Sequence, residues 1–424
     1  MASDHLWVWY GVGSEYQPKV ADLLHRFEVE RGIPVESELV PLSDVEARLR
    51  ALPEGARVPD LVLAAEVDVR RLADSGAFLP AEGCLELIGS SLDRELLDVA
   101  RLTWSLDGEL WAIPFNLSTP LLYYNRHLLA EAGLYEPPQT IADVAAATRM
   151  LTASGSSQGL VFDQNLIVWV AEQWPARQGQ PLIGQVGQEA FAHLDAPELI
   201  ADLSQLRDLV NEGAATYVGT NPSGAEDLML LLSEQRPGAM VPHTSGSLGA
   251  TIEVARGVGV STDDYAVGPL PAPTRVGASD RDVAWMHGSG ALAGGAAWWV
   301  TARGNADPAV AVSLAAFLAS PRQQAELART TGYVPISPTA TLDPALTERW
   351  SAHPQLEVPY DILAAVPDDQ VFAGPQVGPR REIRALVIRA FDRILAGEEP
   401  AEALRAARLG AEQLLRAYQL DAPR

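Results

Sequence analysis

The 424-residue chain has little positive charge, a single cysteine and no long apolar run. Asp and Glu number 55 against 31 Lys and Arg, which gives a formal net charge of −24. Because this charge repels phosphate backbones, it argues against a nucleic-acid partner and favours a neutral or cationic ligand. No apolar run reaches the roughly 18 residues that a membrane-spanning helix needs. We therefore expect a globular protein that does not bind nucleic acid.

The residues needed for common metal and nucleotide sites are also missing. Cys84 is the only cysteine, which excludes an intrachain disulfide and a metal site made of cysteines. The seven histidines show no H-x-x-x-H spacing. Lys19 is the only lysine, so there is no Gly-Lys-Ser/Thr phosphate-binding loop. We expect no metal and no cofactor.

Arginine in place of lysine, with abundant Ala, Gly and Pro, is typical of a GC-rich bacterial genome such as an actinobacterial one. The residues from Met1 to His5 show no charged segment followed by an apolar one. Composition alone therefore leaves two possibilities, a cytoplasmic protein or an exported one whose signal segment is absent from this sequence.

The chain is longer than the roughly 250 to 300 residues over which one core grows, so we expect two lobes. Residues 6–10, 34–40 and 60–64 predict strands, the last of the buried type, and residues 18–31 predict an amphipathic helix. Ser43 and Glu46 match an S-x-x-E capping box that would open a helix to residue 52. This β-α-β-α-β order predicts a doubly wound α/β lobe, in which ligands bind beyond the carboxyl ends of the strands.

The remainder of the chain predicts mostly helices with a few short strands. Thr140 is placed to cap one helix, and Gly133 and Gly332 to end two others. The other expected elements are helices at 126–133, 140–151, 308–319, 321–330, 381–396 and 401–418, and strands at 238–242, 264–268 and 298–300.

Polar and aromatic side chains gather at the predicted strand ends and crossings. Aromatic rings stack on the apolar faces of sugars, while short polar side chains and carboxylates bind hydroxyl groups. The set suits a site for a small polyhydroxylated molecule, although Tyr and Trp at strand ends also serve as core edges. It comprises Tyr10, Ser14, Glu66, Asn116, Ser118, residues 244–247 and 294–295, Trp298 and Tyr333.

Residues 114–125, Pro-Phe-Asn-Leu-Ser-Thr-Pro-Leu-Leu-Tyr-Tyr-Asn, resemble the first inter-lobe crossing of the extracellular solute-binding proteins of ABC importers, the maltose-binding-like family. The resemblance is strongest to the glycerol-3-phosphate-binding members. Matching segments follow in the family's order at 216–219, 245–248, 294–296, 299–300, 331–336 and 374–384.

The resemblance implies a periplasmic-binding-protein fold, with two α/β lobes that close on a ligand by rotation about a hinge. Chain crossings near Asn116, Gly295 and Tyr333 would form that hinge. The N-terminal lobe would contain residues 1–116 and 297–334, and the C-terminal lobe residues 117–296 and 335–424.

The resemblance also carries the family's ligand positions onto this chain at Glu66, Ser118, Thr244, Gly295, Tyr333 and Arg384. Leu42 departs from the pattern, because the glycerol-3-phosphate-binding members have a tyrosine there. Their paired tryptophans fall in residues 163–169, where neither ring is clearly kept. The full set expected to bind the ligand is Tyr10, Glu66, Asn116, Ser118, Asp163, Trp169, Thr244, Ser245, Gly295, Trp298, Tyr333 and Arg384.

These departures, together with an acidic Asp163 expected near Glu66, argue against a phosphate ester, since carboxylates favour hydroxyl or ammonium donors over a phosphate dianion. We expect a carbohydrate or amino sugar, stacked on Tyr333 and on Trp169 or Trp298. The alternative is glycerol-3-phosphate or a glycerophosphodiester such as glycerophosphocholine. Arg384 supports that alternative if its guanidinium faces the ligand, and has no bearing on it if it pairs with a lobe carboxylate.

The role that the resemblance implies is the substrate-binding component of an ABC importer. Such a protein makes no covalent bonds, works as a monomer and delivers its ligand to membrane permease subunits. It would be extracytoplasmic, either periplasmic or a cell-surface lipoprotein. The rival class is a secreted carbohydrate-active enzyme with an acidic pair in the same site.

Overall fold

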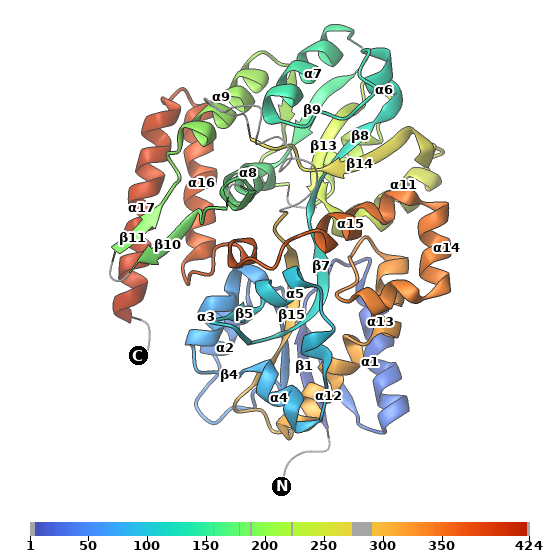
Figure 1. Cartoon of the computed structure of the whole chain (residues 1–424), viewed down its shortest axis with the longest axis vertical. Helices are drawn as coiled ribbons and strands as arrows, with labels where there is room; N and C mark the ends of the chain where they lie inside the picture. Colours follow the sequence, from blue (N-terminus) through green and yellow to red (C-terminus); the bar gives the residue numbers. More distant parts are fainter. Residues whose placement is uncertain are drawn as a thin grey trace.

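The computed structural model describes residues 5–155, 157–177, 179–186, 189–221, 224–273 and 291–421. It has two lobes, one above the other in Figure 1, and each lobe is built around its own β-sheet with helices on its faces. The lower lobe contains the N-terminal strands, and the upper lobe contains most of the middle of the chain. The predicted α/β fold with two lobes is confirmed.

The first sheet has six strands, and its parallel part begins the chain as predicted. β1 (Leu6–Tyr10) pairs in parallel with β2 (Val35–Leu39) and with β3 (Leu61–Ala65). β15 (Gly294–Thr301) runs antiparallel to β3 and also pairs with β4 (Phe78–Leu79) and β7 (Ile113–Ser118). α1 (Gln17–Arg31) packs on this sheet through an apolar face, as its sequence period predicts.

The capping box expected from Ser43 and Glu46 is wrong. α2 (Val45–Arg50) begins after Asp44 and has no side-chain cap. The Ser43 hydroxyl donates to Asp44, and the Glu46 carboxylate is held by Arg50 and Arg71 instead. Guanidinium groups that lie within reach compete for a carboxylate that would otherwise bond the helix N-terminus.

The second sheet has five strands in the order β12-β9-β13-β8-β14. β8 is antiparallel to both of its neighbours, whereas β9 is parallel to β12 and β13. The cap at Thr140 is confirmed, because its side chain and that of Asp143 form a reciprocal capping box. The strands are β8 (Pro120–Asn125), β9 (Gln158–Phe162), β12 (Ala215–Tyr217), β13 (Gly238–Thr244) and β14 (Tyr265–Pro269). A separate antiparallel pair, β10 (Ile183–Val186) and β11 (Glu189–Ala192), packs against α17 through β11.

The helices divide between the lobes. Those that contact the first sheet or its neighbours are α3 (Val69–Asp74), α4 (Ala81–Leu87), α5 (Asp98–Thr103), α12 (Pro308–Leu318) and α13 (Pro321–Thr330). The upper lobe holds α6 (Arg126–Glu131), α7 (Ile141–Ala153), α8 (Gln164–Arg177), α9 (Pro197–Asn211), α10 (Glu226–Leu231), α11 (Leu248–Gly257), α16 (Arg380–Leu395) and α17 (Pro400–Asp421). Two further helices are α14 (Pro344–Ala352) and α15 (Val358–Ala364). Two short strands, β5 (Ser105–Leu106) and β6 (Glu109–Leu110), pair with each other.

Short 3-10 turns join several of these elements. Two of them enter the site, η1 (Glu66–Asp68) directly after β3 and η3 (Ser245–Ser247) directly after β13. The others are η2 (Leu92–Arg94), η4 (Thr262–Asp264), η6 (Pro338–Leu342), η7 (Pro354–Leu356) and η8 (Gln370–Ala373).

Two apolar clusters hold the molecule together. The larger surrounds the first sheet, includes Val69 and Leu72 of α3, and continues through the crossings to one face of the second sheet. The smaller fills the other face of the second sheet, where α16 buries Ile383, Val387 and Phe391. α3 and α16 therefore belong to different lobes, and Cys84 lies buried in the larger cluster.

The chain passes between the lobes where three segments lie side by side. β7 ends at Ser118 and β8 begins at Pro120, so one crossing occurs at Thr119. Gly294 pairs with Ser118, and Val334 bridges to Leu117. These segments coincide with the predicted crossings, while their action as a hinge stays a prediction.

The predicted lobe boundary after residue 334 also stays a prediction, because the elements that follow it have neighbours in both lobes. η6 and α14 contact α13, whereas α15 contacts both α5 and β14. Among the described residues, no helix combines the length and apolar character required to cross a membrane.

Candidate functional site

The crossing between the lobes is fixed by Asn116 and Gly295. Asn116 is buried in β7, and its Oδ1 accepts a hydrogen bond of 2.7 Å from the backbone of Ala296. Gly295 has φ +129°, and a Cβ on it would lie 1.8 Å from the Asn116 carbonyl oxygen. Only glycine fits this close approach of two strands. Its N–H points to Glu66, whose Oε2 lies 3.4 Å away.

Glu66 and Arg384 meet across the two lobes. Glu66 begins η1 at the carboxyl end of β3, and Arg384 lies on α16. Arg384 Nη2 donates to Glu66 Oε1 at 3.2 Å, and the side chains of Arg384 and Glu66 are 26% and 11% exposed. The sequence and the resemblance both pointed to Glu66, whereas the resemblance alone pointed to Arg384, and the structure brings the two residues together.

Glu172 is a third member of this cluster, and the sequence analysis missed it. It lies on α8 with a side chain only 6% exposed, and Arg384 donates to it through Nε at 2.7 Å and Nη2 at 2.8 Å. Arg380 donates to the same carboxylate at 2.6 and 3.3 Å. Burial opposes ionisation of Glu172, but the two guanidinium groups outweigh it and hold the pKa of Glu172 well below its usual value.

The sequence contained only a weak indication that Glu172, Arg380 and Arg384 form a cluster. Arg380 and Arg384 stand four residues apart, which places both on one helical face. Glu172 is a carboxylate within the largely apolar stretch from Leu166 to Ala176. Nothing in the sequence relates these two segments, because 208 positions separate Glu172 from Arg380.

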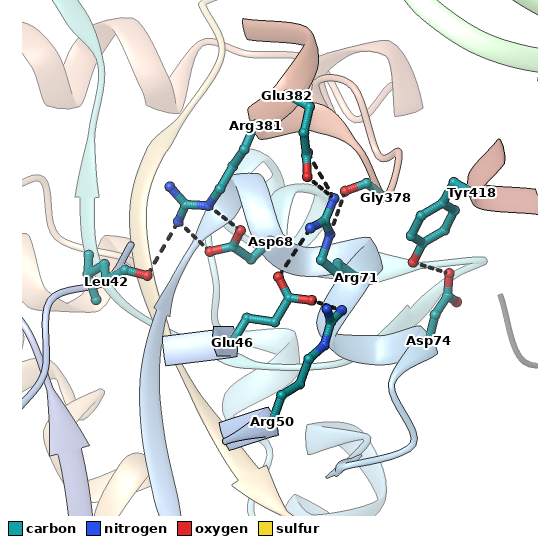
Figure 2. Close-up of polar contacts among 10 residues, drawn as sticks. All are labelled: Leu42, Glu46, Arg50, Asp68, Arg71, Asp74, Gly378, Arg381, Glu382 and Tyr418. Carbon is teal, nitrogen blue, oxygen red and sulfur yellow. Dashed lines mark hydrogen bonds and ion pairs between the residues drawn. The ribbon is translucent and has the colours of Figure 1, made fainter. Parts of the chain in front are cut away.

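A row of polar contacts continues from this cluster along α3, and Figure 2 shows it. Arg381 binds Asp68 through two hydrogen bonds of 2.5 Å, and its Nη2 also donates to the carbonyl of Leu42. Arg71 binds both carboxylate oxygens of Glu382, at 2.7 and 2.8 Å.

The row ends at the hydroxyl of Tyr418 on α17, which donates to Asp74 Oδ2 at 2.9 Å. We call these three contacts, Asp68–Arg381, Arg71–Glu382 and Asp74–Tyr418, the cross-lobe row. Each of them joins the first lobe to α16 or α17.

Asp68 is the most buried residue of the cross-lobe row, at 4% exposure. Burial raises the pKa of its carboxyl, and the ion pair with Arg381 opposes that shift only in part. The same ion pair raises the pKa of Arg381, although burial acts against it.

The remaining short polar candidates lie close to the crossing. Ser118 is buried at the end of β7, and Ser245 Oγ accepts a hydrogen bond of 3.1 Å from the backbone of Thr119. Thr244 Oγ1 accepts from Gly246 N at 3.2 Å. Tyr333 is half-buried and packs on Tyr16 at 5.6 Å between ring centroids. Burial raises the pKa of Tyr333.

Trp298 requires a correction. Its ring is fully buried in the larger cluster, 5.5 Å from that of Phe115. The stacking role suggested for Trp298 is therefore wrong, because alternation along β15 points this side chain into the core of the first lobe. Tyr10 is also a core residue, at 4% exposure.

Asp163 and Trp169 lie in the second lobe, and their predicted contacts with a ligand stay predictions. Asp163 is 1% exposed and accepts from the backbone and amide of Asn165, both at 2.8 Å, and from the amide of Asn221 at 3.2 Å. These bonds give Asp163 the role of an N-terminal cap for α8. Trp169 is partly buried against the smaller cluster.

A cavity of about 730 Å³ lies between the lobes beside Asp74 and Tyr418. Glu172 lines it, together with the β10 strand and residues 374–379, whereas Glu66, Gly295 and Tyr333 do not. Within the described ranges, no group of three or more His, Cys, Asp and Glu side chains could hold a metal ion.

A two-lobed α/β chain with polar side chains at its crossings has the architecture of a solute-binding protein. Residues 22–358 match the family model described as bacterial extracellular solute-binding protein. The chain belongs to this family and is the substrate-binding component of an ABC importer.

The similar proteins span nearly the whole chain. The sn-glycerol-3-phosphate-binding periplasmic protein UgpB of Escherichia coli K12 is 26% identical over 434 residues, covering 97% of this chain and 92% of its own. The crystal structure of UgpB from Mycobacterium tuberculosis, in complex with glycerophosphocholine, matches with a TM-score of 0.75 and 20% identity, covering 99% and 100% of the two chains.

Sugar-binding structures match equally well. The GacH receptor of Streptomyces glaucescens, solved unliganded and with acarbose, gives a TM-score of 0.76 at 18% identity, covering 97% and 98% of the two chains. The sugar-binding protein MalE of Xanthomonas citri gives 0.77 at 17% identity, covering 98% of each. At these identities the likeness shows a common fold.

Proposed function

We propose that the chain binds a carbohydrate or amino sugar between its lobes and delivers it to the permease subunits of an ABC importer. The binding position is the crossing site, defined here as Glu66, Asn116, Gly295, Tyr333 and Arg384. The observation that carries the proposal is the charge balance at this site. Arg384 is paired with Glu172 and Glu66, and Arg380 with Glu172, so two positive charges meet two negative ones.

A neutral polyhydroxylated solute suits such a balanced group. Its hydroxyls can donate to Glu66 and accept from Arg384 without adding charge. A phosphate dianion would instead leave an excess of negative charge in a site that is partly removed from water. The ammonium group of an amino sugar would bind the carboxylate of Glu66. The ring of Tyr333 provides an apolar face on which a sugar can stack.

Two of the similar structures support a sugar ligand, since one is a sugar-binding MalE and the other was solved with acarbose. The second candidate is glycerol-3-phosphate or a glycerophosphodiester such as glycerophosphocholine. It is favoured by the partly exposed Arg384 guanidinium, which retains donors for an anion, and by the names of the two UgpB proteins.

The proposal includes the setting in which an importer component works. It places the protein outside the cytoplasmic membrane, as a periplasmic protein or a lipid-anchored one, acting as a monomer. The crossings near Asn116, Gly295 and Tyr333 serve as the hinge, and the protein makes no covalent bonds. New reducing ends on incubation with oligosaccharides would contradict that last point and favour the enzyme class.

A thermal-shift screen tests the ligand class. The panel contains maltose, glucosamine, glycerol-3-phosphate and glycerophosphocholine, and a solute at 100 times its dissociation constant adds about 2.7 kcal/mol to the free energy of unfolding. A rise in Tm with maltose or glucosamine alone supports the proposal. A rise with the two phosphoesters alone replaces it with the second candidate.

A further inference from the structure

Glu172 lies against Arg384 of the crossing site and binds more of its guanidinium group than Glu66 does. The carboxylate is 6% exposed, and it takes two of the three guanidinium nitrogens of Arg384, at 2.7 and 2.8 Å. The contact from Arg384 to Glu66 is longer, at 3.2 Å. Arg384 is therefore oriented chiefly from its own lobe by Glu172, and the contacts with Glu172 and Glu66 engage its Nε and Nη2.

The charges around Arg384 come from three elements. α8 supplies Glu172, η1 supplies Glu66, and α16 supplies Arg380. A second carboxylate of η1, Asp68, is matched by Arg381. Without Glu172 the two guanidinium groups of Arg380 and Arg384 would share Glu66 alone, and the group would carry one net positive charge.

We propose that Glu172 is a positioning and specificity-determining residue of the crossing site, which fixes the Arg384 guanidinium and cancels its charge. Arg384 then donates hydrogen bonds to neutral hydroxyls and does not act as an anion receptor. This inference rests on the proposed function in one respect, that the solute meets Arg384. It assigns the choice between neutral and anionic solutes to a residue outside the set that the sequence indicated.

The test measures binding of sn-glycerol-3-phosphate by isothermal titration calorimetry to the wild type and to variants. Glu172→Gln keeps the size of the side chain and removes its charge. We expect it to bind glycerol-3-phosphate about tenfold more tightly than the wild type, or more, since couplings between close charges commonly reach that size. Glu172→Asp keeps the charge and is expected to stay within about threefold of the wild type.

Asp68→Asn is the matched control. It also removes a buried carboxylate partner of an α16 arginine and changes the net charge of the protein by the same amount. Because Arg384 keeps Glu172 in this variant, its affinity for glycerol-3-phosphate should not rise, and the loss of one contact of the cross-lobe row should lower it slightly instead. An equal gain in Asp68→Asn and Glu172→Gln would overturn the proposal, because net charge alone would then explain both.

A second variant covers the case in which Glu172→Gln does not fold. Glu172→Met/Arg380→Met replaces the buried pair with apolar side chains, an exchange that proteins often tolerate, and it also frees Arg384. A gain in glycerol-3-phosphate binding is expected here too. No gain in any folded variant that lacks the Glu172 carboxylate contradicts the inference.

These outcomes are distinct from a failure of the proposed function. If no sugar in the thermal-shift panel binds, the proposed ligand class is wrong, whereas the order of glycerol-3-phosphate affinities among the Glu172 and Asp68 variants still reports on Arg384. Conversely, a sugar that binds equally well before and after Glu172→Gln, with no gain for glycerol-3-phosphate, leaves the proposed function intact and removes the role given to Glu172.

Discussion

Arg381 forms a two-bond ion pair with Asp68, although the two residues belong to different lobes. The nitrogens and oxygens lie 2.5 Å apart in both bonds, and Asp68 follows β3 of the first sheet while α16 packs on the second. Arg71 of α3 and Glu382 of α16 repeat this relationship. A movement that separates the lobes must break these contacts, so the cross-lobe row stabilises the arrangement in which the lobes are together.

Removing two arginines of the row should open the ligand-free protein. In Arg71→Gln/Arg381→Gln, the ion pairs that join η1 and α3 to α16 are both lost, and we expect a larger radius of gyration by small-angle X-ray scattering. Solute affinity should fall about five- to tenfold, which is typical of such coupling. Arg393→Gln is the control, because Arg393 pairs with Glu398, five residues further along the same part of the chain. A radius unchanged from the wild type would show that the row has no part in closure.

Salt should act on the same contacts. Between about 0.01 M and 1 M ionic strength the Debye length falls from about 30 Å to about 3 Å, so partly exposed ion pairs weaken. The Glu382 side chain is 42% exposed and that of Arg381 is 36% exposed. We expect solute affinity of the wild type to decline with salt, and that of the double variant to decline less. Parallel salt dependences would contradict this prediction.

Gly295→Ala should damage the crossing far more than Gly294→Ala. A Cβ at Gly295 would lie 1.8 Å from the Asn116 carbonyl oxygen, in a backbone conformation with φ +129°. A Cβ at Gly294 meets Ser118 Oγ at 3.5 Å, which is ordinary contact. Chemical denaturation should show a loss of about 3 kcal/mol or more for the first variant and under about 1 kcal/mol for the second. Equal losses would mean that the crossing adapts to a side chain.

The stabilising effect of Glu172 should disappear in acid. Because its folded pKa lies below the unfolded value of about 4.3, its contribution to stability is complete above that pH and is lost as the pH falls toward the folded pKa. At pH 7, Glu172→Gln should lower the free energy of unfolding by about 3 kcal/mol, since two guanidinium groups lose a buried partner. Urea unfolding at several pH values should show this difference shrinking below about pH 4.3. A difference that is constant with pH contradicts the assignment.

Local patterns predicted much of the fold. The strand at Leu6–Tyr10 and the helix at Gln17–Arg31 appear as expected, because their apolar period and flanking turn residues are local signals. The capping box predicted at Ser43 does not form, because Arg71, which lies on a different helix, binds the carboxylate of Glu46. The competition from Arg71 is tertiary and leaves no trace in the sequence around Ser43, whereas Arg50, which also binds Glu46, stands four residues along the same helix.

The site shows the same division between local and distant information. Glu66 and Arg384 were identified through matched segments, and they meet in the structure. Trp298 was misread because alternation in a strand does not reveal which face of the sheet is covered. Glu172 was missed because its importance arises from a helix more than 200 positions away. Pairing of distant charges is a property of the folded chain that local spacing does not express.

The central claim, that the crossing site between the lobes binds the solute, is tested most directly by titration calorimetry on Glu66→Gln. The probe is whichever of maltose and glucosamine raises Tm more, and Glu326→Gln, whose carboxylate pairs with Arg26 within the first lobe, is the control. We predict that Glu66→Gln weakens binding at least tenfold, about 1.4 kcal/mol, while Glu326→Gln leaves it unchanged. Full affinity in Glu66→Gln would contradict the placement of the solute at the crossing.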